Sequence, residues 1–248
     1  MRFETISLRN NLSKKKRLEV VASIINRSSS DIILFGGHTV LDMADCNELV
    51  DRIENKETSV VFEVKRVEES SFIKLKNCLY RIENACLKNM FTNQLFSTSK
   101  EIESNIPLCE RFINELETKR IIEIKKKRCL VVQCGEINVV KNIQKEGNRP
   151  VFRLSNTRDL EKRFFDLLDS VDIIMNPIHT PMGNHGKMER RRELLSSNCR
   201  YYFSTSNTDE RHSIDSSSLQ YSFYNGNRFV ETIREVSKDV QIRIFDID

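Results

Sequence analysis

Hydrophobic and polar positions in the first third of the chain alternate between the periods of strands and helices. Residues 2–8 alternate apolar and polar side chains, which predicts a strand, and residues 12–25 gather apolar positions as an amphipathic helix does. The apolar run 32–35 predicts a buried strand that stops at Gly36-Gly37, followed by a helix over about 41–55 and a strand over 60–67. Strands this apolar are covered on both faces, so the pattern predicts a sheet flanked by helices.

The middle and the C-terminal part repeat strands and helices in a less regular order. Residues 78–82 and 90–96 predict two paired strands around a turn at Glu83-Asn84. Helices are predicted over about 108–119, 138–145, 160–170 and 189–198, and strands over 121–124, 129–133, 151–154 and 201–206. A further strand over 172–177 is expected to be closed by Pro177, and residues 220–248 supply two or three more strands.

Length and composition favour one α/β domain over residues 1–248. No stretch is apolar enough to span a bilayer and the start lacks a signal-peptide core, so we expect a soluble, cytoplasmic protein. Seven scattered cysteines indicate neither a disulfide framework nor a zinc site. The net charge of +4 is the small difference between 40 basic and 36 acidic residues, which makes nucleic acid an unlikely partner.

The segment RCLVVQCGEINVV, residues 128–140, carries the most informative chemistry. A buried strand that ends in a sharp turn at Gly135 would lift the Cys134 sulfur to the edge of a sheet, where a nucleophile is useful. The alternative is that Cys134 fills a core, because free cysteine is among the most frequently buried residue types. The segment alone leaves both interpretations open.

Four motifs in order make the chain resemble the carbon–nitrogen hydrolase (nitrilase and amidase) superfamily over nearly its full length. They are SSSDIILFGGHTV, LFSTSK, VVQCGE, and the final series VDIIMNPIHTP, ERRRELLSSNCR and YYFSTSN. The resemblance implies a four-layer α-β-β-α sandwich, two sheets face to face with helices outside. It also implies a small-molecule amide or nitrile-type substrate, no cofactor, and pairing of subunits into a homo-oligomer through outer helices.

The same resemblance assigns roles to individual residues. Cys134 would attack the substrate carbon and form a covalent thioester, while Lys100 and the backbone N–H of Gly135 would stabilise the oxyanion. Asn176 and His179 would border the substrate pocket, Asn176 also fixing the loop beside the cysteine. His185 and the arginines of the following helix would lie near the same loop and could bind an anionic substrate group.

One departure from the family pattern bears directly on catalysis. The glutamate expected after the strand at 32–35, in a proline–glutamate dipeptide, is replaced by Gly36-Gly37. His38 is the nearest replacement base in the sequence, and Glu63 on the next strand is a second candidate. Metal chemistry is disfavoured because the histidines lack ligand spacing. A catalytically impaired pseudoenzyme that acts as a binding or regulatory module is therefore the alternative to a hydrolase.

Overall fold

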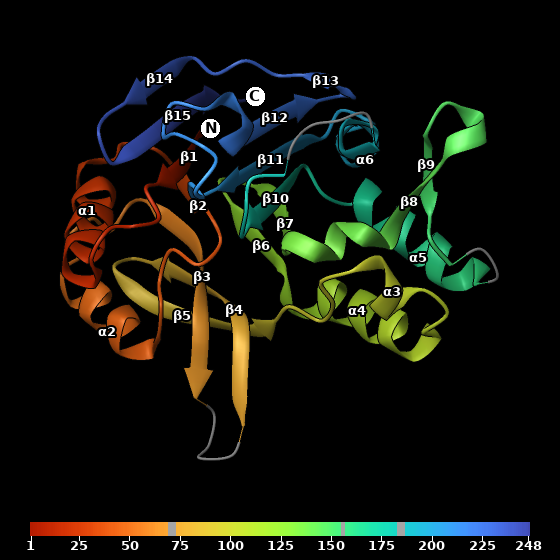
Figure 1. Cartoon of the computed structure of the whole chain (residues 1–248), viewed down its shortest axis with the longest axis horizontal. Helices are drawn as coiled ribbons and strands as arrows, with labels where there is room; N and C mark the ends of the chain where they lie inside the picture. The colour runs from red at the N-terminus through yellow and green to blue at the C-terminus, as the bar shows by residue number, and fades with distance from the viewer. Residues whose placement is uncertain (69–72, 155–156, 183–186) are drawn as a thin grey trace.

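Two large β-sheets form the centre of the molecule in the computed structural model, which describes residues 1–68, 73–154, 157–182 and 187–248 (Figure 1). The first sheet has the order β14-β15-β1-β2-β3-β4-β5 and the second the order β13-β12-β11-β10-β7-β6, while β8 and β9 form a separate pair. The strands of the first sheet are β1 (Arg2–Leu8), β2 (Ile32–Phe35), β3 (Ser59–Glu68), β4 (Lys74–Glu83), β5 (Cys86–Asn93), β14 (Ile233–Val236) and β15 (Val240–Asp246). Those of the second sheet and the small pair are β6 (Ile121–Ile124), β7 (Lys127–Val131), β10 (Ile173–Ile178), β11 (Tyr201–Ser206), β12 (Gln220–Tyr224), β13 (Asn227–Arg228), β8 (Val140–Ile143) and β9 (Arg149–Phe152).

Helices cover the outer faces of both sheets. The α-helices are α1 (Lys14–Arg27), α2 (Met43–Asp51), α3 (Ser99–Ile102), α4 (Ile106–Lys119), α5 (Arg158–Asp169) and α6 (Lys187–Leu195), and the 3-10 helices are η1 (Cys134–Val139), η2 (Gln144–Glu146) and η3 (Ser217–Leu219). In Figure 1, α1 and α2 lie on one side of the sheets and α4 and α5 on the other. No helix among the described residues is both long and apolar enough to cross a membrane.

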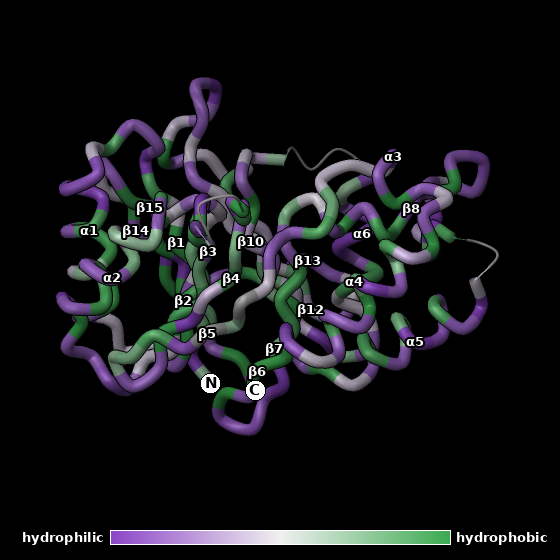
Figure 2. The backbone as a smooth tube through the Cα atoms, turned by 90° about the horizontal axis from the view of Figure 1, so that it is seen from below, coloured by the Kyte–Doolittle hydropathy of each residue, from purple (hydrophilic) through white to green (hydrophobic). Residues whose placement is uncertain are grey.

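The alternation of side chains along each strand divides the core into three apolar layers. Ile32 and Leu34 of β2 face the second sheet, where they share one cluster with Val131 of β7 and Met175 of β10. Successive side chains of a strand point to opposite faces, so the intervening Ile33 packs with α1 and α2 instead. A third cluster packs α4 and α5 on the outer face of the second sheet. The green, apolar segments in Figure 2 include β2 and β7 of the two sheets. The predicted four-layer α-β-β-α sandwich is confirmed.

Parallel pairing brings several strand ends to one edge of the sandwich. β1, β2 and β3 run parallel in the first sheet, and β7, β10 and β11 run parallel in the second. The N–H of Gly37, just after β2, donates to the carbonyl oxygen of Ile178 at the end of β10 (2.9 Å), which ties the two sheets together there. Ligands of parallel sheets commonly bind outside the carboxyl ends of the strands, so this edge is where a site is expected.

Two sequence predictions were wrong in this part of the chain. The helix predicted over 138–145 is instead the end of η1 followed by β8, because Val140 and its neighbours pair with β9. Pro177 lies inside β10 and does not close it. The missing N–H of Pro177 costs no bond to β7, since the β7 pairing ends at Met175, two residues earlier.

Candidate active site

Cys134 is the first residue of η1, three residues after the end of β7 at Val131. The turn is held by a capping box in which the Glu136 side chain accepts from the backbone N–H of Gln133 (2.9 Å). The Cys134 side chain is partly exposed, whereas Cys46, Cys78, Cys109 and Cys129 are buried and Cys86 and Cys199 lie on the surface. The core-filler interpretation therefore does not describe Cys134, which lies at the edge of the sheet.

A buried ion pair anchors the turn that carries Cys134. The guanidinium of Arg120 contacts both carboxylate oxygens of Glu136, and neither side chain is exposed. Glu136 also accepts from the N–H of Leu95 (2.9 Å). With both carboxylate oxygens of Glu136 occupied in this way, this residue supports the turn that carries Cys134.

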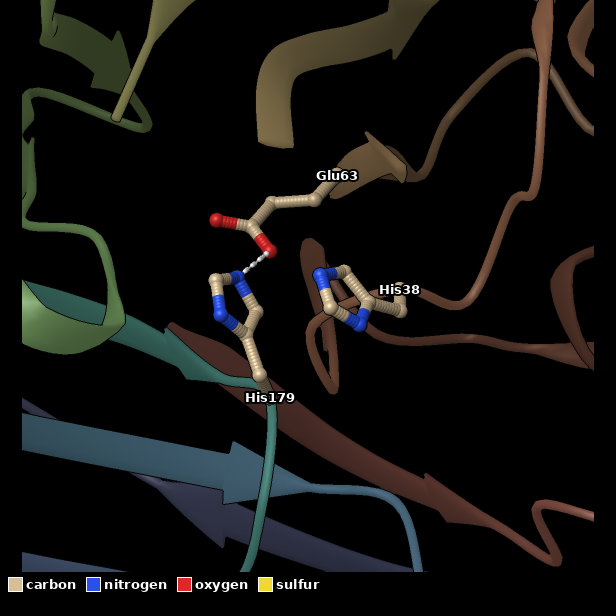
Figure 3. A group of neighbouring side chains, drawn as sticks. All are labelled: His38, Glu63 and His179. Carbon is tan, nitrogen blue, oxygen red and sulfur yellow. Dashed lines mark hydrogen bonds and ion pairs between the residues drawn. The ribbon is translucent and has the colours of Figure 1, made fainter. Parts of the chain in front are cut away.

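His179 joins Cys134 to a buried carboxylate. Figure 3 shows the His179 ring, which follows β10, directed at the Glu63 carboxylate, and the His179 Nε2 to Glu63 Oε2 distance is 2.7 Å. The other Glu63 oxygen accepts from the Gln133 side chain (2.7 Å). The backbone N–H of His179 donates to the Cys134 sulfur (3.4 Å). Residues that follow β7 and β10 thus meet Glu63 of β3 in one hydrogen-bonded group.

His38 lies against the same group without touching the sulfur. Its backbone has a left-handed φ of 61°, and its ring stacks on that of His179 with centroids 3.9 Å apart and planes 11° apart. The His38 Nε2 donates to the side-chain oxygen of Asn77 (2.7 Å). Among the described residues, no hydrogen bond joins His38 to Cys134, and the His38 ring instead packs on the ring of His179.

The surroundings separate the protonation states of the two imidazoles. Burial alone would lower the pKa of His179, but the Glu63 carboxylate and the Cys134 sulfur outweigh burial and raise that pKa to about 10. Burial, together with the charge on His179, lowers the pKa of His38 to about 4. Burial would raise the pKa of Glu63, but the His179 charge and the hydrogen bonds that Glu63 accepts lower it. At neutral pH the His179 imidazole is therefore charged, the His38 imidazole is neutral and the Glu63 carboxylate is anionic.

Gly37 leaves the space that the His179–Glu63 pair occupies. A Cβ atom at position 37 would lie 2.5 Å from His179 Cδ2 and 2.8 Å from Glu63 Oε2, both closer than real contacts allow. At Gly36, a Cβ would lie 2.8 Å from the backbone nitrogen of Asn207. A larger residue after β2, such as the family's glutamate, would therefore displace the His179–Glu63 pair. The pair in this position requires glycine at position 37.

Other residues predicted for the site lie elsewhere. The side chain of Lys100 is exposed on α3 and, within the described residues, makes no hydrogen bond to Cys134. Asn176 is fully buried: its amide nitrogen donates to Val132 O, and its oxygen accepts from the Tyr202 hydroxyl (2.8 Å). Asn176 thus fixes the strand before Cys134 and does not border a pocket. His185 lies outside the described residues.

Close packing explains the glycine at position 135. A Cβ there would come within 2.5 Å of the Ser97 Cα atom. Packing of the Ser97 loop against η1 therefore requires this glycine.

His38, Glu63 and His179 also offer three ligand-type atoms within 4.8 Å of one another. An imidazole lone pair lies in the plane of its ring. Because the two rings are stacked and nearly parallel, their lone pairs do not converge on one ion unless a ring rotates.

Known structures share the arrangement of two packed sheets with outer helices. No protein-family model and no curated protein matches the amino-acid sequence. Solved structures do match: a glutamine-dependent NAD(+) synthetase from Cytophaga hutchinsonii has a TM-score of 0.62 and 11% identity, covering 100% of this chain and 43% of the synthetase chain. The chain thus spans less than half of that protein.

Two smaller proteins match over most of both chains. A CN-hydrolase superfamily protein from Xanthomonas campestris has a TM-score of 0.57 and 12% identity over 99% of this chain and 90% of its own. A variant of the amidase from Nesterenkonia sp. AN1, with the acetamide moiety of fluoroacetamide added at its active-site cysteine, has a TM-score of 0.58 and 8% identity over 100% and 90%. This chain therefore has the nitrilase fold, at a sequence identity that does not transfer an activity.

Proposed function

We propose that this protein hydrolyses an amide or related C–N bond through a covalent intermediate on Cys134. The observation that carries the proposal is the position of His179, whose ring is held by Glu63 and whose backbone contacts the Cys134 sulfur. In this proposal His179 is the acid and base, and Glu63 orients its ring. The family's glutamate base is replaced by a cysteine–histidine–glutamate group of the kind that activates thiols in other enzymes.

The geometry supports a two-step reaction. Because Nε2 of His179 is bound to Glu63, Nδ1 is the ring nitrogen left for the sulfur. The Cys134 thiolate attacks the carbonyl carbon, and the imidazolium then gives its proton to the leaving amine as the C–N bond breaks. Water attacks the resulting thioester while neutral His179 takes a proton from it, which releases a carboxylic acid and restores the thiolate–imidazolium pair.

The oxyanion of the intermediate needs a hydrogen-bond donor. The backbone N–H of Gly135 lies in the first turn of η1 and has no acceptor among the described residues, so it can serve this role. The family resemblance assigns a second donor to Lys100, but no contact of Lys100 with Cys134 supports this. We therefore expect Lys100→Met to reduce hydrolysis less than threefold, in contrast to variants of Cys134, His179 and Glu63.

The test is hydrolysis of a panel of small amides and nitriles, measured by release of ammonia or amine. Cys134→Ala should abolish turnover, and His179→Gln should reduce it by about 10²-fold or more, the usual contribution of general acid–base catalysis. His212→Gln is the matched control, because His212 also pairs with a carboxylate, Asp209 (2.6 Å), but in a different loop. Turnover that survives in Cys134→Ala, or no turnover by the wild-type protein across the panel, would contradict the proposal. The latter result would favour the pseudoenzyme alternative.

A further inference from the structure

Two arginines meet at the far end of the helix that Cys134 begins. Arg191 of α6 donates through Nε to the Asn142 side chain and through Nη1 to the Asn138 side chain, both at 2.9 Å. Arg153, just after β9, donates through Nε to the backbone oxygen of Asn138 (2.6 Å). Asn138 is the fifth residue of η1, so both guanidinium groups are fixed to the helix that carries the cysteine.

No ion pair neutralises either arginine in the part of the chain that the structure describes. Arg191 is only 9% exposed, yet among the described residues no carboxylate forms an ion pair with Arg191 or Arg153. The two guanidinium groups lie close enough for Arg153 to contribute to the lowered pKa of Arg191, after the larger effect of burial, while Glu103 acts on Arg153 only at longer range. A charged group as buried as Arg191 is normally paired, and Arg153 beside it is half-buried, so two adjacent cations without an ion pair indicate a place for an anion.

Donors remain available for such an anion. Nη2 of Arg191 and both Nη atoms of Arg153 have no hydrogen-bond acceptor within the described residues, and none of them is fully covered. A carboxylate accepts two parallel N–H bonds from a guanidinium, which is the geometry these free nitrogen atoms offer.

The position of the pair relative to Cys134 limits the size of the ligand. The Asn138 side chain also donates to the Gly135 carbonyl oxygen (2.9 Å), which links the arginines to the turn of the cysteine. At about 2 Å rise per residue of a 3-10 helix, Asn138 lies roughly 8 Å along the axis from Cys134. A substrate of a few methylene groups would reach from one to the other.

We propose that Arg153 and Arg191 form a carboxylate subsite, which makes the substrate an amide whose chain ends in a carboxylate a few bonds from the C–N bond that is cleaved. This inference rests on the proposed reaction at Cys134. The carboxylate would accept from both guanidinium groups and orient the carbonyl carbon toward the sulfur.

The test uses thiol reagents and needs no knowledge of the natural substrate. N-iodoacetyl derivatives of ω-amino acids of two to five carbons are compared with the N-iodoacetyl alkylamines of equal length, and alkylation of Cys134 is measured by peptide mapping. We expect one acid of the series to react at least tenfold faster than its neutral counterpart, and to saturate with concentration. Arg153→Gln and Arg191→Gln should each reduce that preference by about 10-fold or more, the usual value of hydrogen bonds to a charged group.

The controls separate the possible failures. Arg149→Gln removes an exposed arginine of β9 that pairs with Glu146, and should leave the preference unchanged. Iodoacetamide, which has no carboxylate, gives the intrinsic reactivity of Cys134 in each variant, and the preference for the acid is expressed relative to that rate. Circular dichroism reports that the variants are folded. If Cys134 reacts with iodoacetamide but shows no preference for any acid, the subsite is refuted and the proposed reaction is not. If Cys134 reacts with neither reagent, the proposed reaction fails first.

Discussion

Replacing Glu63 by glutamine tests the acid–base group with a minimal change of shape. The glutamine can occupy the same space and can still accept from Gln133 or His179, but it carries no charge. With Glu63 in place the pKa of His179 is about 10. Without it, burial is opposed mainly by the cysteine sulfur, so we expect the pKa of His179 to fall to about 6.5 or below. The fall of the His179 pKa from about 10 to about 6.5 corresponds to about 5 kcal/mol in the free energy of protonating the imidazole, at about 1.36 kcal/mol for each tenfold change in the acid dissociation constant.

The assay is a pH titration of histidine side chains by NMR. The chain has only four histidines, so single substitutions assign every imidazole signal. In the wild-type protein the His179 signal should stay in the charged form up to about pH 9, and in Glu63→Gln it should titrate near or below pH 6.5. A wild-type His179 that titrates at the ordinary value of about 6.5 would refute the proposed charge state. An unchanged pKa in Glu63→Gln would refute the role of the carboxylate.

Three further predictions concern the supports of the site. Gly37→Ala should disrupt the His179–Glu63 pair, change the reactivity of the Cys134 thiol and cost about 1–3 kcal/mol of stability in chemical denaturation by overpacking. Gly147→Ala is the control: Gly147 is a left-handed glycine with open surroundings, so this change should lower stability without changing thiol reactivity. Glu136→Gln should destabilise the fold by about 3 kcal/mol, because it leaves the buried Arg120 guanidinium with only the longer contact to Glu115 (3.6 Å). Combining it with Arg120→Met should recover part of that loss, and a loss below about 1 kcal/mol would contradict the buried ion pair. The pKa of His38 is lower in the folded state, so protonation favours the unfolded chain. As the pH falls from 6.5 to 4, the wild type should lose up to about 3 kcal/mol of its free energy of unfolding relative to His38→Gln. Parallel curves of unfolding free energy against pH for the two proteins would contradict this.

Most of the fold could be predicted from the period of the apolar positions. Strands 2–8 and 201–206 and the α/β order were visible because each strand contributes to two apolar layers. The short segments after Cys134 could not be predicted in this way, because four-residue strands such as β8 take their conformation from their partner strand and not from a local pattern. The pairing of subunits through outer helices stays a prediction.

The candidate site was predicted only in part. Cys134 was recognised because an apolar strand and a glycine mark its turn. The partnership of His179 with Glu63 was missed because the two residues are 116 positions apart and meet only when the sheets pack. One signal was available: Glu63 is a charged residue between the fully buried Phe62 and Val64, and a carboxylate in such a strand needs a partner.

Alkylation of Cys134 by iodoacetamide at pH 6.5 tests the central claim most directly. An ordinary thiol of pKa about 8.5 is only about 1% thiolate at that pH. In the proposed reaction the charged imidazole of His179 lies beside the Cys134 sulfur and favours its attack on the reagent. Ion-paired thiolates are less nucleophilic, so we expect Cys134 to react about tenfold faster than the exposed Cys86 and Cys199 in the same chain. His179→Asn should remove this advantage. Equal rates for the three cysteines of the wild-type protein would contradict the proposed thiolate–imidazolium pair.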